Sequence, residues 1–88
     1  MPKKRERLEV IHDILSAIGA GRMGPTRLLS ASNLSPEMFR NYIDELLKKE
    51  FIIEIEEKKK KMYQVTKKGF LFLERYMIFS DFVGTLGL

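Results

Sequence analysis

Residues 33–49 read NLSPEMFRNYIDELLKK, and they contain the clearest helix start in the chain. Ser35 can cap free backbone N–H groups, Pro36 suits the first helical position, and Glu37 complements the positive end of the helix dipole. Steps of three and four then place apolar side chains on one face: Phe39, Ile43, Leu46 and Leu47. The other face carries Glu37, Arg40, Asn41, Asp44 and Lys48. The segment therefore predicts an amphipathic helix over residues 36–49.

Two further helices are predicted before this segment. From Arg5 onward, apolar residues recur at helical spacing and are expected to face inward: Leu8, Ile11, Ile14, Leu15 and Ile18. Gly19 and Gly21 are expected to end that helix. Pro25 begins a short second helix, which carries Leu28 and Leu29 inward until residues 30–33 interrupt it.

A β-hairpin and a last helix are predicted after this segment. Residues 51–56 are rich in isoleucine and indicate a strand with Ile53 and Ile55 inward, and residues 62–65 indicate a second strand with Tyr63 and Val65 inward. The charged tip between them, residues 57–61, has no glycine, so its turn type stays open. Thr66 is the expected N-cap of a helix over residues 67–83, with Gly84 and Gly87 in a frayed tail.

The order helix, short helix, helix, hairpin, helix predicts an α+β, mainly α, fold: a winged helix-turn-helix with a three-helix core, a β-hairpin wing and a C-terminal helix. We expect residues 1–88 to form one domain, with core and wing over 5–66 and the last helix over 67–83. In helix-turn-helix proteins the later helix enters the major groove of DNA. Residues 36–49 are therefore the candidate recognition helix.

Several spaced elements also resemble a known family: Asn33-Leu34-Ser35, Asn41-Tyr42-Ile43, Phe51-Ile52-Ile53-Glu54 and Tyr63 to Gly69. They resemble, over residues 5–75, the small archaeal winged-helix DNA-binding proteins, whose best-known members dimerise through a C-terminal antiparallel coiled coil. The resemblance implies binding to double-stranded DNA. Two features depart from the family pattern. Pro36 stands where an aromatic residue is often seen, and the last helix lacks the long charged heptad extension. Coiled-coil dimerisation therefore cannot be carried over unchanged.

Composition excludes several classes of site. The 88 residues include no cysteine and one histidine, which excludes disulfides, thiolate zinc sites and a histidine metal cluster within one chain. The sequence has no glycine-rich phosphate loop and no nucleophile elbow, so we expect no enzyme, no cofactor and no metal. The most apolar stretch, residues 70–88, contains Glu74, Arg75 and Asp81, and is a poor membrane span. No signal peptide is evident, and the expected location is the cytoplasm, in association with the nucleoid.

Net charge alone does not decide the function. The chain has 16 basic and 12 acidic residues, a net charge of +4. This excess favours a polyanionic partner, but a composition rich in Lys and Glu is also typical of hyperthermophile proteins. The positions of the charges are more informative than their sum.

The candidate DNA-binding residues are Thr26, Arg27, Ser35, Arg40, Asn41, Lys48, Lys58, Lys59, Lys60 and Lys61. Arg40 and Asn41 have the donor and acceptor groups that pair with guanine and adenine; the alternative is that they are ordinary solvated residues. Lys58 to Lys61 can contact phosphates from the wing, or can protect a solvated hairpin edge from aggregation. Thr26, Arg27 and Ser35 are phosphate candidates, although capping alone explains Ser35. Residues 1–4 are expected to form a short basic arm.

The last helix is apolar on more than one side, which a small three-helix core cannot cover. Phe72, Tyr76, Phe79 and Phe82 follow steps of four, four and three, and are predicted to form the contact of a homodimer. Leu73 and Met77 are expected to face the parent domain. The alternative is that the tail folds back over its own domain.

Together these features predict a dimeric protein that binds double-stranded DNA as a transcriptional regulator or an architectural chromatin protein. The alternative function is a protein–protein interaction module that uses the winged helix without nucleic acid. Its support is the acidic residues near the wing and the apolar last helix.

Overall fold

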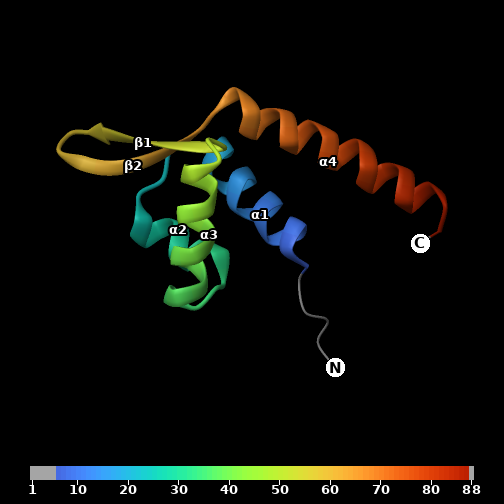
Figure 1. Ribbon diagram of the computed structural model, residues 1–88, viewed down its shortest axis with the longest axis horizontal. Coiled ribbons are helices and arrows are strands. Elements are labelled where there is room, and N and C mark those ends of the chain that lie inside the picture. The colour runs from blue at the N-terminus through green and yellow to red at the C-terminus, as the bar shows by residue number, and fades with distance from the viewer. Residues whose placement is uncertain (1–5, 88) are drawn as a thin grey trace.

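The computed structural model describes residues 6–87. They form α1 (Arg7–Ala20), α2 (Pro25–Ser32), α3 (Pro36–Lys48), β1 (Ile52–Glu57), β2 (Lys60–Val65) and α4 (Lys67–Thr85). The first three helices gather into one body, the hairpin extends from it to one side, and α4 leaves toward the other (Figure 1). The predicted fold, a three-helix core with a β-hairpin wing and a C-terminal helix, is confirmed. The basic arm expected at residues 1–4 lies outside the described residues.

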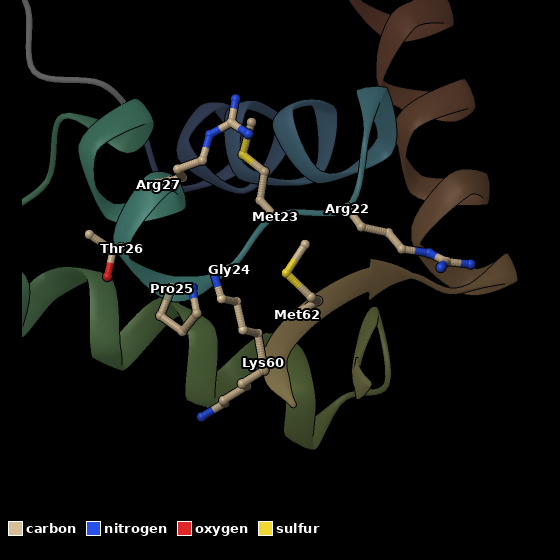
Figure 2. Close-up of a pocket in the computed structure, with 9 residues that line it drawn as sticks. Arg22, Met23, Gly24, Pro25, Thr26, Arg27, Lys60 and Met62 are labelled. Atoms are coloured by element: carbon tan, nitrogen blue, oxygen red, sulfur yellow. The ribbon is translucent and has the colours of Figure 1, made fainter. Parts of the chain in front are cut away.

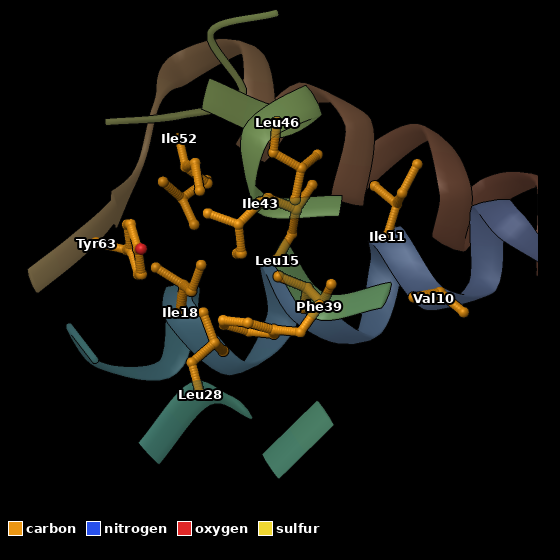
Figure 3. Packing of buried hydrophobic residues seen from close by; sticks show 12 residues of the cluster. Val10, Ile11, Leu15, Ile18, Leu28, Phe39, Ile43, Leu46, Ile52 and Tyr63 are labelled. Atoms are coloured by element: carbon orange, nitrogen blue, oxygen red, sulfur yellow. The ribbon is translucent and has the colours of Figure 1, made fainter. Parts of the chain in front are cut away.

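The core lies where α1, α2, α3 and the base of the hairpin meet (Figure 3). Its most enclosed side chains are Ile14, Leu15, Leu28, Leu46 and Ile52. On α1 the predicted inward residues are buried, with one exception: Leu8 is 54% exposed, and Val10 is buried instead. Leu8 lies in the first turn of α1 and borders a hollow between α1, α3 and α4 rather than filling the core. The expectation for Leu8 was therefore wrong.

The connection between α2 and α3 is made by local hydrogen bonds. We expected α2 to stop at Ser30, but it continues to Ser32, whose hydroxyl donates to the Leu29 carbonyl at 2.8 Å. Asn33 then adopts the left-handed conformation, with φ 57°, and ends the helix. Ser35 caps α3 as predicted, because its Oγ accepts a hydrogen bond from the backbone N–H of Met38 at 3.2 Å.

The end of α3 is closed by a two-bond motif. The N–H of Phe51 donates to the Leu46 carbonyl at 2.9 Å, and the N–H of Glu50 donates to the Leu47 carbonyl at 3.1 Å. This motif needs a left-handed residue after the helix, usually glycine, and here Glu50 takes that role with φ 62°. The sharp turn brings the chain directly into β1.

The hairpin pairs Ile52 with Val65 at its base and Glu57 with Lys60 at its tip. Lys58 and Lys59 form a two-residue turn in which both φ angles are positive, which is the type I′ geometry. Tyr63 and Val65 are buried as predicted.

The predicted inner face of β1 was wrong. Paired residues of antiparallel strands lie on the same face of the sheet. Ile52 therefore shares the buried face of Val65, whereas Ile53 lies on the opposite face and is 43% exposed.

Helix α4 begins at the predicted cap, where the N–H of Gly69 donates to Thr66 Oγ1 at 3.1 Å. It continues to Thr85, so Gly84 belongs to the helix and not to a frayed tail. Its first half packs on the body: Phe72 and Leu73 are partly buried against the core, and Tyr76 stacks on His12 with ring centroids 4.4 Å apart. Met77, expected to face the parent domain, is 61% exposed, so that expectation was wrong.

The second half of α4 extends beyond the body (Figure 1). Its large apolar side chains are exposed: Met77, Ile78, Phe79, Phe82 and, just after the helix, Leu86. No helix within residues 6–87 has both the length and the apolar character needed to cross a membrane.

Candidate nucleic-acid interface

The outer face of α3 carries the predicted base-reading residues. Arg40 and Asn41 are both exposed, and Lys48 follows on the same side near the end of the helix. Glu37 and Asp44 share this face, so its charge is mixed. Ser35, at the start of the helix, already uses its Oγ as the helix cap. Its contact with a phosphate stays a prediction.

A groove of 480 Å³ separates the start of α2 from the wing (Figure 2). The structure brings together four of the predicted DNA-binding residues on its walls, namely Thr26 and Arg27 from α2 with Lys60 and Lys61 from β2. The other lining residues were not predicted: Arg22, Met23, Gly24, Pro25 and Met62. The place of Met23 in the groove could not be predicted from sequence. It depends on a backbone hydrogen bond from the N–H of Tyr63 to the Met23 carbonyl, 2.8 Å long, between segments far apart in the chain.

A second hollow of 270 Å³ adjoins the groove and reaches α3. It is lined by Arg40 and Asp44 of α3 and by Tyr63 of the wing, and it shares Pro25 and Lys61 with the groove. The edge of α3, the start of α2 and the base of the wing therefore form one continuous surface. Lys58 and Lys59 lie outside both hollows, at the tip of the wing.

Two of the cations on this surface are partly neutralised by acidic neighbours. Lys61 Nζ lies 3.1 Å from Glu54 Oε1, and the hydrogen bond to Glu54 raises the pKa of Lys61. Arg22 donates to Glu57 at 2.8 Å. In contrast, Arg27, Arg40, Lys58, Lys59 and Lys60 form no ion pair with any residue between 6 and 87. Each of these five cations is therefore available to an external anion.

The structure divides the four predicted dimerisation residues into two pairs. Phe72 and Tyr76 contact their own domain, through an edge-on contact of Phe72 with Phe51 and the stacking of Tyr76 on His12. Phe79 and Phe82 contact their own domain little and are 63% and 60% exposed. Dimerisation through α4 stays a prediction for all four.

A model of the family described as winged helix-turn-helix matches residues 4–83. The chain belongs to the winged helix-turn-helix family. This assignment agrees with the sequence-based interpretation that the chain is not an enzyme.

Among curated proteins, the chain is similar to two uncharacterized proteins of Methanocaldococcus jannaschii. It is 39% identical to MJ0290 over 72 residues, which cover 82% of this chain and 32% of that protein. It is 38% identical to MJ0287 over 66 residues, which cover 75% of this chain and 64% of that protein. The chain thus spans about a third of the first relative and less than two thirds of the second.

Among solved structures, the chain is similar to Sso10a-2, described as a DNA-binding protein from Sulfolobus solfataricus. The TM-score is 0.78 with 26% identity, over 93% of this chain and 85% of that chain. The smu.1704 protein of Streptococcus mutans shares the fold, with a TM-score of 0.75 and 12% identity over 99% of this chain and 91% of that chain. The resemblance to small archaeal winged-helix proteins is confirmed.

Proposed function

We propose that this chain binds double-stranded DNA, with α3 in the major groove and the basic wing on the phosphate backbone. The observation that carries the proposal is the distribution of its available cations. Arg27, Arg40 and Lys60 border one continuous surface made by α2, α3 and the wing, and Lys58 and Lys59 extend it to the wing tip. The similar Sso10a-2 is described as a DNA-binding protein, which supports the same function here.

Within this proposal the residues divide into two roles. Arg40 and Asn41 reach base edges, because arginine pairs with guanine and asparagine with adenine through two hydrogen bonds each. Thr26, Arg27, Ser35, Lys48 and the wing lysines contact phosphates, which fixes the position of the protein without reading sequence. Lys61 contributes less than Lys58 to Lys60, because Glu54 already balances part of its charge.

We further propose that two copies associate through α4. The exposed apolar side chains Ile78, Phe79 and Phe82 lie on the half of the helix that extends beyond the body. A second copy would cover them and would place two recognition helices on one duplex. Two such helices on one face of DNA require a spacing of about 34–36 Å.

Salt-dependent affinity for duplex DNA tests the central proposal. Each neutralised phosphate contributes about −0.9 to the slope of log affinity against log salt. For a duplex of about 20–30 base pairs, long enough for two half-sites, fluorescence anisotropy should show a steep loss of affinity between low and moderate salt. Affinity that does not change with salt, or no binding at low salt, would contradict the proposal. The second result would favour the protein-interaction alternative.

Two sets of variants separate positioning from base reading. Replacing Lys58, Lys59 and Lys60 by Gln should weaken binding to all duplexes alike and flatten the salt slope. Arg40→Ala or Asn41→Ala should cost about 1–3 kcal/mol on preferred sequences and less on others. Arg75→Gln on exposed α4 is the matched control for loss of charge. If Arg40→Ala and Asn41→Ala weaken every duplex equally, an architectural role replaces that of a sequence-specific regulator.

A further inference from the structure

The groove between α2 and the wing has an apolar interior. Met23, Pro25 and Met62 are all partly buried on its walls. Figure 2 shows Met62 extending from β2 toward the segment that carries Met23. Apolar pockets of about 300–1,000 Å³ are typical of sites for small organic molecules. At 480 Å³, this groove has the size of such a site.

The local backbone keeps the groove in place and leaves room inside it. The hydrogen bond from Tyr63 N–H to the Met23 carbonyl, 2.8 Å long, ties the segment before α2 to the wing. A Cβ atom on Gly24 would lie 3.2 Å from the Lys61 carbonyl oxygen and 3.7 Å from Met62 Sδ. A side chain at this position would therefore occupy space between α2 and the wing that glycine leaves open.

Positive charge surrounds this apolar interior. Arg27 and Lys60 line opposite walls, and neither forms an ion pair within residues 6–87. Arg22 and Lys61 also line the groove, but each is paired with a glutamate of the wing, Glu57 and Glu54 respectively. The groove is thus complementary to a molecule with an apolar body and one negative group.

We propose that the groove binds a small aromatic carboxylate. A guanidinium such as that of Arg27 matches a carboxylate through two parallel hydrogen bonds, and methionine sulfur makes favourable contacts with aromatic ring edges. Resting on the proposed function, we also infer that occupancy of the groove competes with DNA. Thr26, Arg27 and Lys60 would have to serve both ligands.

Titration of the full chain with indole-3-acetate, followed by ¹⁵N–¹H NMR, tests the site without DNA. The expected result is saturable shifts confined to the amides of residues 22–24, 26, 27 and 60–63. The neutral analogue indole-3-acetamide, and the variant Arg27→Gln with the acid, should each bind about tenfold more weakly, the value of one charge-assisted contact. Arg75→Gln is the matched control and should bind as the parent does. Shifts centred on α4 around Phe79, no saturable shift, or equal binding of acid and amide would overturn the proposal.

A second arm tests the competition. Saturating indole-3-acetate should lower duplex affinity of the parent chain, while indole-3-acetamide at the same concentration should not. Unchanged duplex affinity with the groove occupied would overturn the competition. If the chain binds no duplex in the absence of either compound, the proposed function fails, and the NMR result still decides whether the groove is a ligand site.

Discussion

The body of the molecule and the distal half of α4 contain similar apolar side chains, which are buried in the body and exposed on α4. Among residues 6–87, the twelve buried hydrophobic side chains lie between Val10 and Val65, in α1, α2, α3 and the hairpin. The part of α4 after Tyr76 instead exposes more than half of each large apolar side chain from Met77 to Phe79. Residues of the first kind stabilise the fold, and residues of the second kind are available to another molecule.

The boundary between these regions lies inside α4 rather than at its start. The first turns are held by Gly69 against Phe51, by the edge-on contact of Phe72 with Phe51, whose ring centroids are 6.0 Å apart, and by Tyr76 on His12. Beyond Tyr76 the helix leaves the body (Figure 1). One continuous helix thus changes from an intramolecular packing element to an exposed surface.

The largest expected effect comes from making the same substitution at a buried position of the body and at an exposed position of α4. Leu15→Ala removes a side chain with no exposed surface and should lower the free energy of unfolding by about 2–5 kcal/mol. Leu71→Ala on α4, where the leucine is 49% exposed, should change it by less than about 0.5 kcal/mol. Urea unfolding at low protein concentration measures both. Equal losses would contradict the division, because Leu71 would then belong to the core.

The second prediction concerns Phe79 in the exposed half of α4, where a substitution should change the association of two copies and not the stability of the fold. Phe79→Glu places a charge in the proposed contact between two copies and removes a large apolar side chain, whose full burial contributes roughly 1.5–3 kcal/mol. Sedimentation at micromolar concentration should therefore show dimers for the parent and monomers for the variant. Ser80→Glu, a neighbouring substitution that removes no large apolar group, is the control for added charge. A parent chain that stays monomeric would overturn the proposed dimer.

The starts of α3 and α4 could be predicted because their signals are local. The side chains of Ser35 and Thr66 cap the first turns of α3 and α4 by accepting a backbone hydrogen bond three residues later. The ring of Pro36 fixes its own φ angle at a helical value. These effects depend only on neighbouring residues. The inner face of β1 could not be predicted, because three isoleucines, Ile52, Ile53 and Ile55, fit either face. The choice depends on the pairing of Ile52 with Val65, which the two-residue turn at Lys58 and Lys59 sets.

The candidate site was predicted only in part, because its charges can be read from the sequence but their pairing cannot. Charge along the chain pointed to Arg27, Arg40 and the wing lysines. Sequence could not show that Glu54 balances Lys61 or that Glu57 balances Arg22, because these pairs depend on strand register and on the path of the chain before α2. Sequence also could not show which face of α4 packs inward, because both faces are apolar. The contacts of Phe72 with Phe51 and of Tyr76 with His12 make these two residues inner ones.

The third prediction concerns the junction between the two regions. A Cβ on Gly69 would lie 2.4 Å from the Phe51 carbonyl oxygen and 2.6 Å from Val65 Cγ1, so Gly69→Ala should destabilise the fold by about 1–3 kcal/mol through overpacking. Gly84→Ala is the matched control in the same helix. A Cβ there would meet nothing within 4 Å in the described part of the chain. It should be neutral or stabilising by up to about 1 kcal/mol, because alanine favours helix more than glycine does.

Thermal or urea unfolding of the two variants measures whether each substitution raises or lowers the stability of the fold, and this sign decides the prediction. Opposite signs would confirm that the start of α4 is fixed to the body by close backbone contact. If both substitutions stabilise, α4 can move away from Phe51 without cost, and the first half of the helix would be as independent of the body as the second.

The smallest effect should come from an ion pair within the body. Glu45 on α3 accepts hydrogen bonds from Arg7 at the start of α1 and from Lys49, and these bonds, first of all that of Arg7, lower the pKa of Glu45. A carboxylate whose pKa is lower in the folded state contributes stability above its unfolded pKa, and this contribution is lost as the pH falls through its folded pKa. Unfolding free energy should therefore decline at acidic pH, by less than any effect above because the pair is partly exposed to solvent. Glu45→Gln should reduce this decline and should leave sedimentation at neutral pH unchanged, since the pair lies far from Phe79 in the chain and belongs to the body. An unaltered pH profile in Glu45→Gln would show that packing alone joins α1 to α3.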